Sequence, residues 1–152
     1  MPKVTLGPAT HEPDPAHPVL GAGTGPYSYQ LVGDAGGLTK FGAHVEVLPP
    51  GSRSGHRHWH EAEDEMIYML AGEVVLIEDA ETPLRVGDAA CWPAGLAVGH
   101  CLENRSDSDA MYLVIGTRAQ NDRIHYPDHG LITEKTGPAR NYWRTDVPER
   151  PD

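Results

Sequence analysis

The segment that decides the fold runs from residue 51 to residue 72. It reads Gly51-Ser-Arg-Ser-Gly-His56-Arg-His58-Trp-His60-Glu-Ala-Glu-Asp-Glu65-Met-Ile-Tyr-Met-Leu-Ala-Gly72. Its three histidines are spaced by two, so on a β-strand their side chains share one face. Imidazoles on one face, joined by a carboxylate from a neighbouring strand, form a nitrogen and oxygen site for a divalent transition metal. The spacing predicts such a site, and a solvated loop rich in His and Glu is the alternative.

A helical reading of the same segment competes with the strand. Residues Glu61–Leu70 are rich in good helix formers. A helix would place His56 and His60 four residues apart on one face, which is also a plausible metal pair. The zinc-protease pattern His-Glu-x-x-His is absent, because Asp64 stands where its second histidine would be.

A second segment, downstream, strengthens the strand interpretation. It reads Gly87-Asp-Ala-Ala-Cys-Trp-Pro93-Ala-Gly95-Leu-Ala-Val-Gly-His100-Cys-Leu-Glu-Asn104. The two segments, in this order, resemble the two motifs of the cupin superfamily. The first motif has a glycine, a His-x-His pair, a glutamate and a second glycine, and the second has a glycine, Pro-x-Gly, a histidine and an asparagine. The motifs span residues 51–104, the surrounding strands extend the resemblance to about 27–118, and the chain looks like a single-domain bacterial cupin.

The resemblance implies a metal site with four ligands, His58, His60, Glu65 and His100. The chain departs from the family pattern by one additional residue before the histidine pair and by two additional residues before His100. We assign the pair to His58 and His60, because only this choice keeps the distance to Glu65 within the pattern. His56 is then a further ligand or a partner that holds a ligand.

The rest of the chain predicts an all-β fold. Short apolar runs bounded by turn residues are typical of a β-sandwich or barrel. The predicted strands are Tyr27–Val32, Phe41–Leu48, Glu65–Leu70, Glu73–Ile77, Leu84–Val86, Ala89–Trp92, Val98–Glu103 and Met111–Gly116. We expect one cupin-type, jelly-roll-like antiparallel barrel over residues 27–118. A Pro-rich arm precedes it over 1–26, and a coil-rich tail over 119–152 packs on the barrel or on a partner subunit.

Strand alternation also predicts which side chains face the site. Ile67 and Met69 share the face of Glu65 and would form an apolar wall, whereas Trp59 and Tyr68 have the opposite parity and would point outward. In Phe41–Leu48 the apolar alternation runs through Ala43, Val45 and Val47. Each ligating imidazole needs an acceptor for its other nitrogen, and Glu63, Asp64 and backbone carbonyls are the candidates.

Composition narrows the class of partner. The 152 residues fit one domain, and 22 acidic against 12 basic residues give a net charge of −10. Such a chain is repelled by phosphate, which argues against nucleic acid and anionic membranes as partners. No apolar run is long enough to span a membrane, and the start lacks a signal-peptide core. Cys91 and Cys101 are therefore expected as free thiols in the cytoplasm.

The resemblance favours a metal-dependent enzyme, dioxygenase- or decarboxylase-like, that acts on a small organic molecule. A non-catalytic metal- or small-molecule-binding module and an isomerase or epimerase remain as alternatives. The metal is one divalent transition ion among Fe, Mn, Ni, Co, Cu and Zn. Candidate acid–base residues are His56, Glu63, Tyr112 and His44. Edge strands that need cover and aromatic residues of the tail (Tyr126, Tyr142 and Trp143) predict a homodimer.

Overall fold

The computed structural model describes residues 3–145, and nearly all of its regular structure is β-strand. The strands are β1 (Thr10–Glu12), β2 (Tyr27–Leu31), β3 (Phe41–Leu48), β4 (Trp59–His60), β5 (Glu65–Ala71), β6 (Glu73–Ile77), β7 (Glu81–Arg85), β8 (Ala89–Trp92), β9 (Cys101–Glu103), β10 (Ala110–Thr117), β11 (Asn121–Tyr126), β12 (Leu131–Thr136) and β13 (Ala139–Arg144). One short helix, α1 (Val32–Ala35), and a 3-10 turn, η1 (Pro127–His129), complete the described elements.

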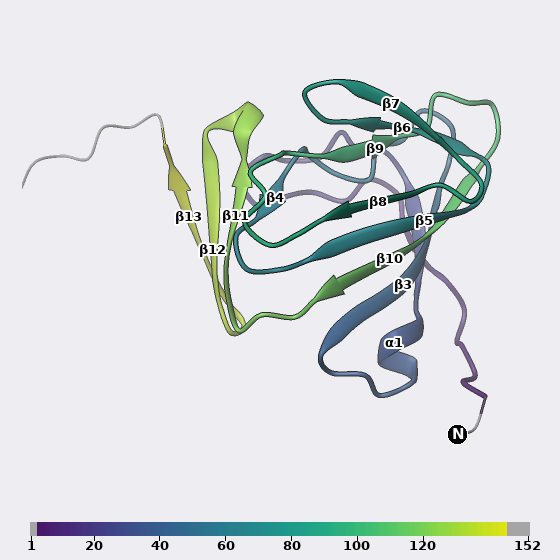
Figure 1. The fold of residues 1–152 in the computed structure, drawn as a ribbon, viewed down its shortest axis with the longest axis horizontal. Coiled ribbons are helices and arrows are strands. Elements are labelled where there is room, and N and C mark those ends of the chain that lie inside the picture. Colours follow the sequence, from purple (N-terminus) through teal and green to yellow (C-terminus); the bar gives the residue numbers. More distant parts are fainter. Residues whose placement is uncertain (1–2, 146–152) are drawn as a thin grey trace, which may run out of the picture.

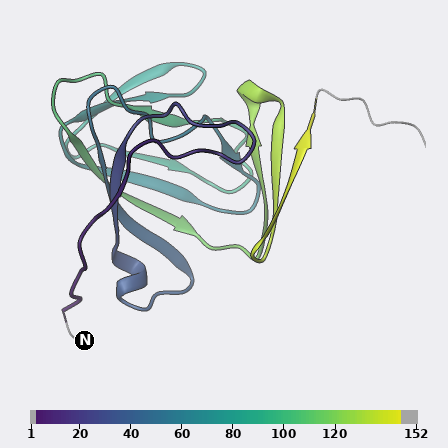
Figure 2. The same cartoon turned by 180° about the vertical axis from the view of Figure 1, so that it is seen from behind.

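The strands form three antiparallel sheets (Figure 1). A six-stranded sheet has the order β1-β2-β3-β10-β5-β8, and a three-stranded sheet has the order β7-β6-β9. A four-stranded sheet, β13-β12-β11-β4, stands across one end of this sandwich, as both ribbon views show (Figures 1 and 2). The all-β, jelly-roll-like prediction is confirmed, although the sheets do not close into one continuous hydrogen-bonded barrel.

The core lies between the six-stranded and three-stranded sheets. Leu48, Met69 and Tyr112 from the larger sheet pack with Val74 and Leu76 from the smaller one, and all five are nearly inaccessible to solvent. Burial of large apolar side chains, at about 1.5–3 kcal/mol each, is the main stabilising contribution to a domain of this size. The turn from β5 to β6 requires Gly72, because its φ of +71° and a carbonyl oxygen 2.5 Å from the position of a Cβ exclude other residues.

The strand prediction is confirmed for Glu65–Leu70, and the helical alternative is wrong, whereas the histidine stretch forms a strand only at Trp59–His60. Residues Glu65–Ala71 form β5, which pairs with both β10 and β8. Ile67 and Met69 are buried on the inner side, and Tyr68 is 41% exposed on the outer side, as its parity predicts. Two strands start three residues from the predicted position: β9 starts at Cys101 rather than Val98, and β7 starts at Glu81 rather than Leu84 because Glu81–Arg85 pairs along its full length with β6.

The alternating apolar residues of β3 do not face the interior. The residues between them do. Glu46 pairs with Tyr112 and His44 pairs with Val114, and these four side chains face the interior. Val45 and its alternating apolar neighbours therefore form the outer face. The pattern is inverted because the interior here includes a polar cavity.

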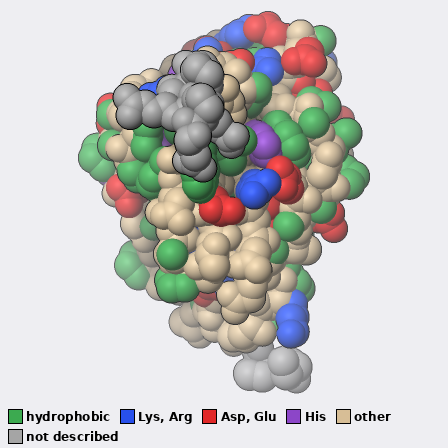
Figure 3. Space-filling view, turned by 90° about the vertical axis from the view of Figure 1, so that its left-hand side faces the viewer, with side chains coloured by type: hydrophobic (Ala, Val, Ile, Leu, Met, Phe, Trp, Pro, Cys, Tyr) green, Lys and Arg blue, Asp and Glu red, His purple; other side chains and the backbone are tan. Residues whose placement is uncertain are grey.

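The coil-rich tail expected over 119–152 is corrected by the structure up to residue 145, and residues 146–152 lie outside the described residues. Residues 121–144 form the meander β11–β12–β13, whose turns contain Gly130 and Gly137, both with positive φ. β11 pairs with β4 of the same chain, at Ile124 with His60 and at His125 with Trp59. Charged and histidine side chains lie among hydrophobic ones on this end of the molecule (Figure 3).

The N-terminal arm is mostly irregular over residues 3–26. Its one strand, β1, extends the six-stranded sheet by pairing with β2. None of the helices over residues 3–145 has the length and apolar character needed to span a membrane.

Candidate metal centre

Two of the predicted ligands are joined by their own backbones. The amide of His58 donates to the carbonyl of His100 at 3.2 Å, and the amide of His100 donates to the carbonyl of His58 at 3.0 Å. This pair of bonds brings the two halves of the sequence pattern together, and the imidazole centroids lie 5.4 Å apart. His60 follows on β4, with its ring centroid 5.2 Å from that of His58.

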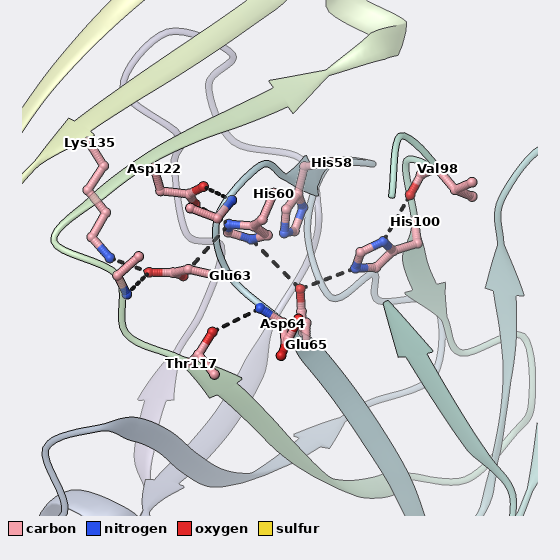
Figure 4. A network of polar contacts seen from close by, with 12 residues as sticks. His58, His60, Glu63, Asp64, Glu65, Val98, His100, Thr117, Asp122 and Lys135 are labelled. Atoms are coloured by element: carbon pink, nitrogen blue, oxygen red, sulfur yellow. Dashed lines mark hydrogen bonds and ion pairs between the residues drawn. The ribbon is translucent and has the colours of Figure 1, made fainter. Parts of the chain in front are cut away.

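Glu65 lies between the imidazoles at the start of β5. Its Oε2 is 3.2 Å from Nε2 of His100 and 3.7 Å from Nε2 of His60 (Figure 4). Ligand atoms of His58, Glu65 and His100 all lie within 4.8 Å of one another. Burial alone would raise the pKa of Glu65, but the hydrogen bond from His100 and the adjacent imidazoles lower it to about 2. Glu65 is therefore an anion at neutral pH, which is the form that binds metals.

All three imidazoles direct Nδ1 at an oxygen acceptor. Nδ1 of His58 donates to the carbonyl of His56 at 2.8 Å, Nδ1 of His100 donates to the carbonyl of Val98 at 3.2 Å, and Nδ1 of His60 lies 2.6 Å from Oδ2 of Asp122. Because an acceptor fixes the proton on Nδ1, the lone pair of each neutral ring is on Nε2. This arrangement fits a metal ion bound by three Nε2 atoms and one carboxylate.

His100 and His60 each have acceptors on both sides of the ring. A neutral imidazole carries one N–H, so it satisfies one acceptor and turns a lone pair toward the other. That second nitrogen, which faces Glu65 in both residues, needs a proton or a cation. For His58, burial lowers the pKa below its ordinary value, with Glu65 opposing, and so favours the neutral ligand form.

Asp122 is a site residue that the sequence did not predict. Its side chain is fully buried, and besides binding His60 it accepts the amide of Ala62 at 2.8 Å through Oδ1. The predicted backbone carbonyls serve His58 and His100. Of the two predicted side-chain acceptors, Glu63 lies 3.7 Å from Nδ1 of His60, and Asp64 instead accepts the amide of Ala94. Asp122 carries no local signal, because it stands 62 residues from its histidine in a strand that the sequence did not predict.

A second group of potential ligand atoms comprises His60, Glu63 and Asp122. It uses the Nδ1 side of His60, where Lys135 already binds Glu63 at 2.5 Å and the amide of Ala119 donates to the same oxygen at 3.0 Å. Lys135 thus pairs with Glu63, and a backbone amide donates to each of the two carboxylates. The group therefore acts as the support of His60 rather than as a separate site.

His56 lies outside the cluster of ligand atoms. Its carbonyl orients His58, while its ring packs edge-on against His129, with centroids 5.2 Å apart. His17 from the N-terminal arm and Tyr126 from β11 complete the wall next to it, and their rings lie 5.0 Å apart. The arm and the C-terminal meander thus both cover this side of His58.

Two histidines stack on tryptophan rings, His100 inside the site and His125 outside it. The Trp92 ring stacks on His100 with centroids 3.7 Å apart, and its Nε1 donates to Glu78 at 2.8 Å. Trp59, on the other face of β4, stacks on His125 at 4.0 Å. Trp59 therefore points away from the ligands, as its parity predicts.

An interior cavity of about 190 Å³ adjoins the predicted ligands. His58, Glu65 and His100 line one part of it, and Glu46, His44 and Tyr112 from β3 and β10 line another. His44 and Tyr112 were predicted as acid–base candidates, whereas Glu46 was not. Its signal was present in the alternation of β3, where it shares the parity of His44.

Comparisons with known proteins agree with this architecture. A family model described as a cupin domain matches residues 44–116. A solved structure from Silicibacter pomeroyi, described as a sugar phosphate isomerase from a cupin superfamily, is 37% identical. The match covers 79% of this chain and 77% of that one, with a TM-score of 0.76. The chain belongs to the cupin superfamily.

Other cupins similar to this one have different described roles. A predicted oxalate decarboxylase of known structure from Thermotoga maritima is 28% identical, over 62% of this chain and 83% of that one, with a TM-score of 0.54. The curated oxalate-binding protein of Thermotoga maritima is 36% identical over 69 residues, which are 45% of this cupin. The matched part is 54% of that relative's length. The relatives of known structure thus share the fold, whereas the molecules that the relatives are described as binding or converting differ.

Proposed function

We propose that this cupin binds one divalent transition metal through His58, His60, Glu65 and His100, and that it is a metal-dependent enzyme acting on a small organic molecule. The observation that carries the proposal is the orientation of the three imidazoles. Each has an oxygen acceptor at Nδ1, which directs Nε2 toward the cluster at Glu65. Three nitrogens and one carboxylate suit Fe, Mn, Ni, Co, Cu or Zn.

The residues around the cluster support turnover as well as binding. A bound ion would polarise a ligand oxygen and could exchange electrons, as in dioxygenase- or decarboxylase-like cupins. The chain itself supplies a cavity next to the ligands and a hydrogen-bonded group, Glu46 with Tyr112 and His44, that can hold or exchange a proton. The small cavity suits a small substrate.

Two other functions rest on the relatives. The oxalate-binding relative favours a binding module without turnover, and the sugar phosphate isomerase relative favours an isomerase or epimerase. Metal-loaded protein tested with oxalate, with sugar phosphates and for oxygen consumption separates the three. Oxygen uptake or oxalate breakdown that disappears on removal of the metal supports the enzyme, and isomerisation of a sugar phosphate supports the isomerase. Stoichiometric binding without conversion in every assay supports the module.

The partner of the protein in solution is proposed to be a second copy. The outer face of the six-stranded sheet is apolar, because Val45 and Val47 of β3 lie beside Leu113 and Met111 of β10, with Tyr68 of β5 next to them. Apolar faces of this kind mark interaction surfaces, and an uncharged face is complementary to itself across a two-fold axis. A cytoplasmic location agrees with the two free thiols of the chain.

A further inference from the structure

Glu46 is a charged residue that lines the cavity but is not one of the proposed metal ligands. Its side chain is 15% exposed and lines the cavity that holds His58, Glu65 and His100. It also lines a neighbouring cavity of about 230 Å³, bounded by the N-terminal arm and by His58. A ligand that touches the metal cluster therefore lies within reach of this carboxylate.

The groups bound to Glu46 leave it as an acceptor. The hydroxyl of Tyr112 donates to Oε2 at 2.6 Å, and Nε2 of His44 donates to Oε1 at 3.0 Å. Burial and the negative charge of Glu46 raise the pKa of Tyr112 well above its usual range, so the phenol keeps the proton that it donates. Each carboxylate oxygen retains a second lone pair. Glu46 can thus accept a hydrogen from a ligand.

The two cavities contain no balancing side-chain cation. Among the described residues 3–145, the lining of both includes Glu46 and histidines but neither lysine nor arginine. A phosphate or a second carboxylate would meet Glu46 with no lysine or arginine to pair with. A sugar phosphate or oxalate would therefore place a negative group beside Glu46 without a side-chain cation to offset the repulsion.

We propose that Glu46, supported by Tyr112 and His44, is a subsite for the hydroxyl or amino group of a small neutral or cationic ligand whose other heteroatom binds the metal. The proposal rests on the proposed metal site. The cavity of about 190 Å³ is smaller than the roughly 300–1,000 Å³ of drug-sized pockets, so the ligand has few heavy atoms. Dianions such as oxalate are disfavoured.

Binding of three small chelators to Co(II)-loaded protein tests the subsite. Acetohydroxamate and N-methylacetohydroxamate bind metal through the same two oxygens, but only the first has an N–H. Oxalate has two negative charges and no donor at neutral pH. The change in Co(II) absorption gives a dissociation constant for each probe with the wild type, with Glu46→Gln and with Glu81→Gln. The last is a matched control, because Glu81 is exposed on β7 and paired with Arg105.

Aqueous Co(II) has its own preference between acetohydroxamate and N-methylacetohydroxamate. We expect the preference of the wild-type protein for acetohydroxamate to be about tenfold larger than that, which corresponds to about 1.4 kcal/mol of binding free energy. In Glu46→Gln this preference falls toward the aqueous ratio, and oxalate binds about tenfold more tightly because a like charge has been removed. The Glu81→Gln variant behaves as the wild type. A preference that persists in Glu46→Gln would be steric and would overturn the subsite.

Two measurements on the wild-type protein, its metal content and its binding of the probes, distinguish failure of the metal site from failure of the subsite. Wild-type protein that takes up no Co(II) overturns the proposed metal site together with the subsite. Wild-type protein that takes up Co(II) but favours oxalate over acetohydroxamate at least as strongly as aqueous Co(II) does at the same pH overturns the subsite alone. This second measurement needs no variant, so it decides the question even if Glu46→Gln does not fold.

Discussion

Nδ1 of His60 lies 2.6 Å from Oδ2 of Asp122, a fully buried carboxylate from β11. This contact joins the C-terminal meander, which lies beyond the region matched by the cupin model, to the centre of the proposed metal site. A carboxylate in this position fixes the tautomer of the ligand and increases its basicity. The meander is thus part of the site as well as of the fold.

Replacing Asp122 by asparagine should weaken metal binding while leaving the fold intact. The amide keeps the size of the side chain but removes the charge that orients His60. We expect the dissociation constant for the metal to increase about 10–100-fold, as measured by calorimetry or competition with a chelator. Glu134→Gln, a matched change on β12 at a residue paired with Arg123, should leave the affinity unchanged. Equal affinities in the two variants would contradict the role of Asp122.

The strands whose boundaries the sequence predicted best are those with a clear apolar pattern, whichever face that pattern occupies. β3, β6 and β8 have the predicted boundaries, and β5 extends one residue beyond them, because each has alternating apolar residues or an apolar run that ends at a clear turn. Ligand atoms of three of the four predicted ligands, His58, Glu65 and His100, lie within 4.8 Å of one another, and Nε2 of His60 lies 3.7 Å from Glu65.

The parts that the sequence did not predict are those where polar residues face inward. In β11 the inner positions include Asp122 and Tyr126, so the apolar alternation that identifies a strand is absent. In β3, His44 and Glu46 face the cavity, so the apolar residues mark the outer face instead. The periodicity of apolar residues marks the inner face of a strand where the interior is apolar. Where the interior is a polar site, the apolar residues lie on the outer face instead.

Metal affinity should fall as the pH decreases below about 6.5. Protons compete with the metal for neutral imidazoles, and each imidazole that must lose a proton reduces the affinity by up to about tenfold per pH unit. Burial lowers the pKa of His58, so this residue competes only at the acid end of the range. Glu65, with a pKa of about 2, stays ionised and adds no dependence above pH 4. Affinity that increases from pH 7 to pH 5 would contradict imidazole ligation.

The two cysteines should differ strongly toward alkylation. Cys91 is exposed on β8, whereas burial raises the pKa of Cys101 to about 11. At pH 8 a thiol with that pKa is about one part in a thousand thiolate, which is the reactive form. Iodoacetamide should therefore add one group to the native protein and two after unfolding, as measured by mass spectrometry. Rapid labelling of native Cys101 would contradict its burial.

The outer face of the six-stranded sheet should mediate a homodimer. Light scattering at micromolar concentration is expected to give twice the 16.5 kDa chain mass. Tyr68→Glu introduces a charge on this face and should yield the monomer, because a buried unpaired charge is costly. Val86→Glu, at an exposed turn residue after β7, serves as the control and should remain a dimer. A wild-type monomer would refute the assembly.

Elemental analysis of protein purified without a His-tag or added metal tests the central claim most directly. We predict about one divalent transition metal per chain in the wild type and in His56→Ala, whose ring lies outside the cluster of ligand atoms. His60→Ala and His58→Ala each remove a ligand, and both should retain less than about 0.2 metal per chain. A wild type below that level, or full metal in His58→Ala together with its loss in His56→Ala, would contradict the assignment of the site.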